Sequence, residues 1–97
     1  MEKVFVIGVS GPNQTARQMR ISLAEMERLL HTAGGTIVGQ VTQSMRRFDP
    51  ATLVGTGKVD EIKLQLAQTP ADMVAVDHAL TPVQFRNLER ELGLKVI

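Results

Sequence analysis

The stretch that decides the fold is Val4–Val9, which reads Val-Phe-Val-Ile-Gly-Val. A continuous apolar run rich in β-branched residues is typical of a strand buried on both faces, as in a parallel sheet. Runs of the same kind occur at Thr36–Val41, Met73–Val76 and Leu94–Ile97, and a shorter one occurs at Ala51–Val54. We therefore predict five strands, with the run at residues 51–54 as the third.

The first two strands are separated by a segment with helical spacing. Its apolar residues recur at intervals of three and four and form one helix face; they are Met19, Leu23, Met26, Leu30 and Ala33. The helix can begin anywhere from Thr15 to Ser22, and the capping box formed by Ser22 and Glu25 favours the later start. Gly34-Gly35 is expected to end it in the left-handed conformation.

Two further helices follow. From Thr56 onward, Val59, Ile62 and Leu66 form an apolar face. The stretch Thr81–Gln84 combines a threonine cap, a proline at the first helical position and a glutamine that completes the capping box. The inward face of this third helix is expected to consist of Phe85, Leu88 and Leu92, with Gly93 as its end.

The predicted order of elements is β-α-β-β-α-β-α-β. Buried strands that alternate with amphipathic helices indicate an α/β fold, a small, open, mostly parallel sheet flanked by helices. With 97 residues the chain is expected to form a single domain. In such sheets ligands bind at the carboxyl ends of the strands.

Composition excludes several classes of function. The chain has 43% hydrophobic residues, 3% aromatic residues and a formal net charge of +1, so the core is aliphatic and any basic site must be local. Without cysteine there is no disulfide, thiolate metal site or thiol catalysis, and the two histidines show no metal-ligand spacing. No apolar run is long enough to span a bilayer, and we expect a cytoplasmic protein. The chain ends on apolar strand residues, which suggests a fragment.

The stretch Gly55-Thr56-Gly57-Lys58 resembles a nucleotide-binding P-loop but lacks two of its parts. A P-loop requires a first glycine five residues before the second, where this chain has Thr52, and a hydroxyl residue after the lysine, where it has Val59. What remains is a helix N-terminus that can hold one anion through free N–H groups. The alternative is a tight turn with Lys58 in solvent.

A basic loop precedes this turn. Arg46 and Arg47 can bind phosphates, and Phe48 offers a ring to an unstacked base. The alternatives are a solvated loop and a Phe48 that folds back onto the core. From residue 44 to residue 58 the chain carries three basic residues against the single carboxylate of Asp49. Positive charge is therefore concentrated beside the glycine turn.

Asp77-His78 follows the strand Met73–Val76, at the position where catalytic residues of parallel sheets often lie. No nucleophile accompanies the pair, and a role in a turn or cap explains it as well.

Three stretches resemble the N-terminal domain of the HflX family of ribosome-associated GTPases. They are Gly39–Gln43, Asp49–Val59 and Leu80–Glu89, and the likeness spans nearly the whole chain. The resemblance implies a single HflX-type N-terminal domain at residues 1–97, with a helical linker and a G domain absent from this chain.

The resemblance also implies a function. The domain would bind the large ribosomal subunit near the peptidyl-transferase region, in a protein that can split stalled ribosomes. Its own G domain would bind GTP and Mg²⁺, so the fragment would hold no cofactor and catalyse nothing. We expect Arg46, Arg47, Phe48 and Lys58 to contact RNA, with Gly55, Thr56 and Gly57 as an anion-binding turn.

Two other functions remain open. One is a nucleotide-binding domain in its own right, for ATP or GTP, that uses Gly55–Lys58 and Asp77. The other is a regulatory domain that docks on its own G domain through its helix faces.

Overall fold

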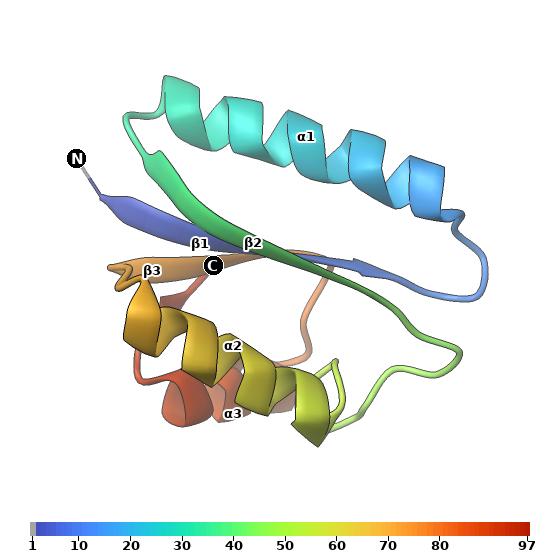
Figure 1. The fold of residues 1–97 in the computed structure, drawn as a ribbon. Helices are drawn as coiled ribbons and strands as arrows, with labels where there is room; N and C mark the ends of the chain where they lie inside the picture. Colours follow the sequence, from blue (N-terminus) through green and yellow to red (C-terminus); the bar gives the residue numbers. More distant parts are fainter. Residues whose placement is uncertain (1) are drawn as a thin grey trace.

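The computed structural model describes residues 2–97 and shows the predicted α/β fold. A four-stranded sheet lies between two helical layers, with helix α1 (Ala16–Thr32) on one face and helices α2 (Thr56–Gln68) and α3 (Pro82–Leu92) on the other (Figure 1). The strands are β1 (Lys3–Ser10), β2 (Thr36–Ser44), β3 (Met73–Asp77) and β4 (Lys95–Val96). Their spatial order is β2-β1-β3-β4.

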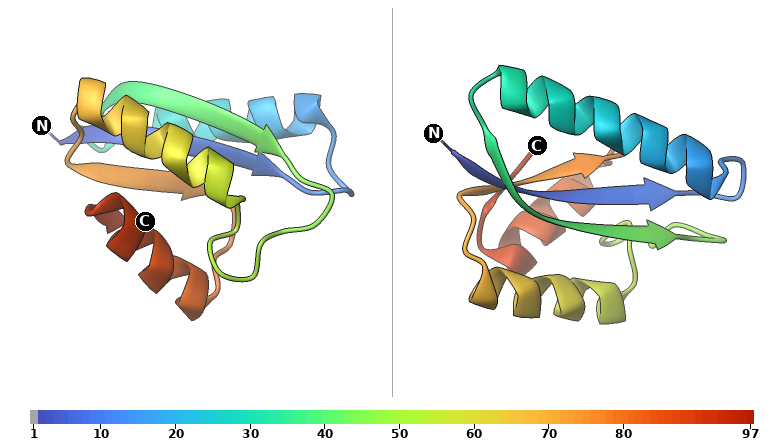
Figure 2. Two further views of the ribbon diagram at one scale, coloured as in Figure 1. Left: turned by 60° about the horizontal axis from the view of Figure 1, so that its bottom comes forward. Right: turned by 45° about the horizontal axis from the view of Figure 1, so that its top comes forward.

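All strand pairs in the described residues are parallel. Each helix returns the chain from the carboxyl end of one strand to the amino end of the next, so the helices begin where the strands end (Figure 2). We call this end of the molecule the carboxyl pole and the opposite end the amino pole.

Alternation along β1 builds the two layers of the core. Phe5, Ile7 and Val9 face the layer of α2 and α3, whereas Val4 and Val6 face Leu23 of α1. These side chains are at most 2% exposed. The central strand is buried on both faces, as its unbroken apolar run predicts.

The predicted third strand at Ala51–Val54 is wrong. These residues form a tight loop closed by an antiparallel bridge between Asp49 and Leu53, with N–H···O distances of 2.9 and 2.8 Å. The Asp49 carboxylate accepts hydrogen bonds from the N–H groups of Ala51 and Thr52. Leu53 adopts φ 66°, which no strand allows. Leu53 and Val54 are nevertheless buried, so the apolar run marks core residues and not a strand.

The favoured late start of the first helix is also wrong. Thr15 caps α1, and Gln18 completes its capping box with distances of 3.0 and 2.8 Å. The earlier start adds helical hydrogen bonds and buries Met19. The predicted ends of helices are confirmed, with φ 96° at Gly34 and φ 69° at Gly93.

The inward face of α3 differs from the prediction at one residue. Gln84 is 5% exposed, whereas Phe85 is 36% exposed. Gln84 is the residue of the capping box, and its Nε2 also donates to the Asp49 carbonyl oxygen at 2.8 Å. The buried position therefore goes to a side chain that ties α3 to the loop at residues 49–53.

Candidate functional site

Three loops meet at the carboxyl pole and form the candidate site. They follow β1, β2 and β3, and they contain residues 11–15, 45–55 and 78–81 respectively. Ser10 and Ser44, at the ends of neighbouring strands, share a hydrogen bond between their hydroxyl groups at 3.0 Å. The Met45 N–H donates to the Ser10 carbonyl oxygen at 2.8 Å. The basic loop is thus held at its base by the sheet.

Arg46 and Arg47 extend from this anchored base into solvent. Both are exposed, and neither makes an ion pair or side-chain hydrogen bond with any other residue in the range 2–97. Their neighbours Met45 and Phe48 pack against the hydrophobic core on either side. The two guanidinium groups are therefore presented as free bidentate donors on a loop whose base is anchored to the sheet.

Phe48 lies between solvent and core. Its ring packs against the ring of His78, with centroids 4.4 Å apart and an interplanar angle of 57°. A Cβ at Gly11 would lie 2.6 Å from Phe48 Cζ, which is closer than van der Waals contact permits. Phe48 therefore joins all three loops of the pole, and the sequence alternative in which it folds back is in part correct.

The glycine turn is less free than its sequence suggests. Gly55 is the N-cap of α2 with φ −67°, and its side-chain position and that of Gly57 face open space. Lys58 is only partly exposed to solvent: its side chain is 17% exposed, and its Nζ lies 2.8 Å from Glu61 Oε2. Val59 is buried in the core, in agreement with the exclusion of a P-loop.

Similarity of the sequence to known proteins identifies the family of this chain. Residues 20–97 match the family model described as GTP-binding GTPase N-terminal. The chain is similar to proteins named GTPase HflX from Flavobacterium psychrophilum (34% identity over 99% of this chain), Alkalihalophilus pseudofirmus (37% over 100%) and Lacrimispora saccharolytica (39% over 99%). This chain belongs to the HflX family. It covers only 22–23% of the length of these three relatives.

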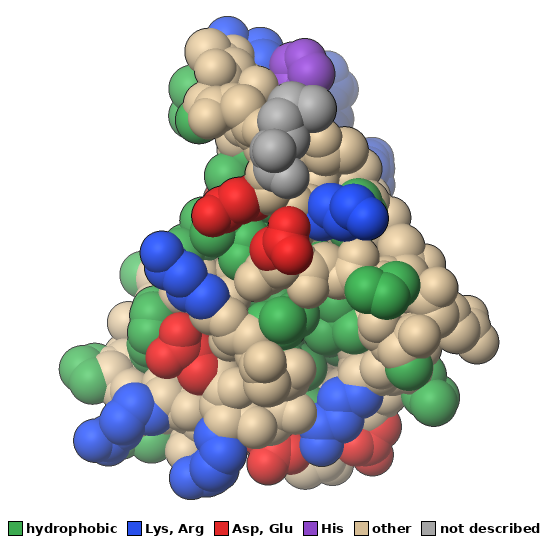
Figure 3. Space-filling view, turned by 90° about the vertical axis from the view of Figure 1, so that its left-hand side faces the viewer, with side chains coloured by type: hydrophobic (Ala, Val, Ile, Leu, Met, Phe, Trp, Pro, Cys, Tyr) green, Lys and Arg blue, Asp and Glu red, His purple; other side chains and the backbone are tan. Residues whose placement is uncertain are grey.

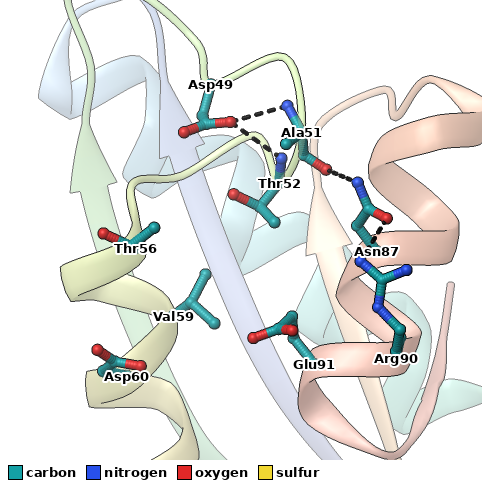
Figure 4. A pocket seen from close by; sticks show the side chains of 9 residues that line it. All are labelled: Asp49, Ala51, Thr52, Thr56, Val59, Asp60, Asn87, Arg90 and Glu91. Atoms are coloured by element: carbon teal, nitrogen blue, oxygen red, sulfur yellow. Dashed lines mark hydrogen bonds between the residues drawn. The ribbon is translucent and has the colours of Figure 1, made fainter.

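The HflX-type domain also has a cleft between α2 and α3, of about 330 Å³ (Figure 4). Its polar groups largely bond to one another: Asn87 Nδ2 donates to the Ala51 carbonyl oxygen, and Arg90 donates to Asn87 Oδ1, both at 2.9 Å. Three carboxylates line it, from Asp49, Asp60 and Glu91. The acidic lining does not suit a phosphate.

The sequence interpretation missed two basic residues of the carboxyl pole. Arg17 and Arg20 lie in the first turns of α1, which begins beside the end of β1, and both are exposed. Arg20 shares a surface hollow with Gln40 and Thr42 of β2. Because the expected late start of α1 placed Arg17 and Arg20 in a loop, these two residues were not assigned to the carboxyl pole.

The amino pole shows no comparable concentration of one charge. Figure 3 looks onto it and shows basic and acidic side chains interspersed with hydrophobic ones. In the described part of the chain, no three histidine or carboxylate side chains are grouped to hold a metal ion. No helix there is long and apolar enough to cross a bilayer.

Proposed function

We propose that this domain is the non-catalytic, RNA-binding module of an HflX-type GTPase, and that it docks on the large ribosomal subunit near the peptidyl-transferase region. The observation that carries this proposal is the pair Arg46 and Arg47, exposed and unpaired within residues 2–97 on a loop anchored to the sheet. The anchored backbone of the loop needs little reordering on binding, and each planar guanidinium can donate two hydrogen bonds to one phosphate.

The neighbouring residues supplement the arginines to different degrees. Gly55 and Gly57 have no contact in this domain that requires glycine, which leaves room for close approach of an RNA backbone. Lys58 must exchange Glu61 for a phosphate, so its contribution is smaller than that of either arginine. Arg17 and Arg20 extend the positive surface at the start of α1.

GTP and Mg²⁺ belong, in this proposal, to a G domain elsewhere in the full-length protein. The relatives named GTPase HflX are about four times as long as this chain, which leaves ample length for such a domain. Directly after Lys58, where a P-loop has the hydroxyl residue that holds Mg²⁺, this chain has Val59, which is buried in the core and offers no ligand. The protein would act in the cytoplasm, where it would split stalled ribosomes.

The decisive experiment measures how salt affects binding to large ribosomal subunits. The variant Arg46→Ala/Arg47→Ala in the full-length protein is expected to bind more weakly. It should also flatten the slope of log K against log salt by about one unit for each phosphate that the variant no longer binds. The matched control is Arg28→Ala/Arg90→Ala, which removes the same charge from exposed arginines with internal partners. Unchanged affinity and slope in the first variant, or equally weakened binding in both, would refute the proposal.

A regulatory role within the protein is the second candidate, and one observation favours it. Val83 and Phe85 expose large apolar side chains on α3, at 46% and 36%. A neighbouring domain that covered them would bury this surface. GTP hydrolysis by the full-length protein with and without residues 1–97, measured in the absence of ribosomes, separates the functions: a pure RNA contact predicts equal rates.

A stand-alone nucleotide site is the weaker alternative, because Lys58 is already paired with Glu61. Titration of the domain with GTP or ATP in the presence of Mg²⁺ tests it. Saturable binding that Lys58→Ala abolishes would favour this alternative over the RNA-binding function.

A further inference from the structure

We propose that the small pocket at the carboxyl pole receives one unpaired nucleobase, an inference that rests on the RNA-binding function. The pocket has a volume of about 200 Å³ and opens between the loops that follow β1, β2 and β3. Six residues line it: Gly11, Pro12, Asn13, Gln14, Phe48 and His78. Sites for drug-sized ligands measure about 300–1,000 Å³. The smaller volume therefore suits a single ring system.

One wall of the pocket is aromatic. The rings of Phe48 and His78 lie against each other, with centroids 4.4 Å apart, and both border the pocket. His78 is held in place because its Nδ1 donates to the Ala79 carbonyl oxygen at 2.9 Å. Aromatic side chains on which unstacked bases lie are the usual feature of sites for single-stranded RNA.

A hydrogen-bonded turn forms another part of the lining. The Gln14 N–H donates to the Gly11 carbonyl oxygen at 3.2 Å, and Pro12 within the turn has a fixed φ. Gly11 has no side chain, which allows the Phe48 ring to close against the turn. The pocket thus exists before any ligand arrives, and binding costs little reorganisation.

The polar groups of the pocket match the edge of a base. The side-chain amides of Asn13 and Gln14 make no hydrogen bond within residues 2–97, so both offer a free donor pair and a free acceptor. Arg46 and Arg47 immediately precede Phe48 in the chain, and their free guanidinium groups can hold the phosphates beside the inserted base. The aromatic wall, the two side-chain amides and the two guanidinium groups together fit one nucleotide of a single strand.

The test measures binding of short fluorescent RNA homopolymers to the full-length protein. Each homopolymer is used as a single strand, as a duplex with its complement, and as a single strand with abasic positions. The variant Phe48→Leu keeps apolar packing but removes the ring. Single-strand affinity is expected to fall by about 5- to 150-fold. The slope against salt should stay unchanged, because the charge of the protein is the same. The abasic strand should bind the variant and the parent protein equally. Phe85→Leu, an exposed aromatic on α3, is the matched control and should bind normally.

The variant Asn13→Ala provides the second measurement. It alters an exposed side chain that packs on nothing in the core, and it should change the preference among the four homopolymers. Saturable binding of a free mononucleotide that Phe48→Leu abolishes, with RNA affinity unchanged, would support the base pocket and assign a free nucleotide as its ligand.

Two results would overturn the inference. One is normal binding of every probe by both Phe48→Leu and Asn13→Ala. The other is an equal fall in affinity of Phe48→Leu for normal and abasic strands, which would make Phe48 a support for the loop. Either result leaves the RNA-binding function standing if Arg46→Ala/Arg47→Ala still flattens the salt slope on large subunits.

Discussion

At the scale of single residues, the glycines divide into those that the fold requires and those that it does not. A Cβ at Gly39 would lie 2.7 Å from two ring atoms of Phe5, a buried residue on the central strand. A Cβ at Gly57 would meet nothing within 4 Å. Gly57 is the second residue of α2, and glycine in the middle of a helix is less favourable than alanine by about 0.5–1 kcal/mol.

The variant Gly57→Ala is therefore expected to raise the free energy of unfolding by at most about 0.5–1 kcal/mol, because the residue lies in the first turn of α2. It should nevertheless weaken binding to large ribosomal subunits if RNA approaches the turn closely. Urea unfolding and a binding titration measure the two effects. Gly39→Ala is the contrasting variant: it should lower the free energy of unfolding by about 1–3 kcal/mol through overpacking. A stabilised Gly57→Ala with normal binding would remove the turn from the interface.

At the scale of elements, two capping boxes of the same type differ in their burial and in their contacts beyond the helix. Thr15 and Gln18 cap α1 at the surface. Thr81 and Gln84 cap α3, but Gln84 is buried and also donates to the Asp49 carbonyl oxygen. Asp49 lies in the segment that carries the basic loop into α2. The third helix is thus connected to this segment through two side-chain amides, those of Gln84 and Asn87.

Replacement of Gln84 by alanine is expected to lower the free energy of unfolding by about 2–4 kcal/mol. It removes a cap and opens a cavity, and it leaves the Asp49 carbonyl oxygen with only its bond from the Leu53 N–H. Gln18→Ala should cost about 0.5–1 kcal/mol, because water replaces its bonds. Thermal and urea unfolding compare the two. Equal effects would show that the bond to Asp49 contributes nothing.

The ion pair between Lys63 of α2 and Glu91 of α3 can be detected by a pH titration of Glu91. Lys63 Nζ lies 2.9 Å from Glu91 Oε1, and this hydrogen bond, followed by the charge of Lys63, lowers the pKa of Glu91 below its ordinary value. The stabilisation is complete above the ordinary carboxyl pKa and is lost as the pH falls through the lowered one. Lys63→Ala should raise the pKa of Glu91 towards its ordinary value, as a carboxyl ¹³C NMR titration measures. Lys58→Ala, which breaks a separate pair with Glu61, should leave it unchanged.

At the scale of the whole molecule, the two layers of the core share their strands. β1 sends Val4 and Val6 to one layer and Phe5, Ile7 and Val9 to the other, and β3 divides its side chains in the same way. The radius of gyration is 12.5 Å, which equals the value of about 12.5 Å expected for a compact chain of this length. Separation of either helical layer from the sheet would expose buried side chains of the central strands.

We therefore expect residues 1–97, expressed alone, to unfold in one cooperative transition. The measurement is urea unfolding followed by far-UV circular dichroism and by the NMR signals of His78, with coincident midpoints. Disappearance of the His78 signals well before the helical signal would show instead that the carboxyl pole opens independently of the sheet.

Local patterns of the sequence determined the fold class and the strands at residues 4–9 and 73–76. They also determined the glycine ends of α1 and α3 and the cap of α3. Each depends on the spacing of apolar side chains or on a single backbone preference, which is written within a few neighbouring residues. The absence of a P-loop follows in the same way, because it is a matter of which residue types stand at which spacing.

The tertiary structure alone decided the rest. Residues 51–54 looked like a strand because burial and strand pairing give the same apolar pattern, and only the bridge between Asp49 and Leu53 distinguishes them. The capping box of Ser22 and Glu25 favoured a late start for the first helix, whereas the structure begins α1 after Thr15 and buries Met19. The pocket between Pro12, Phe48 and His78 joins three distant loops. A contact between residues far apart in the chain has no local signal, since it depends on how the sheet brings the loops together.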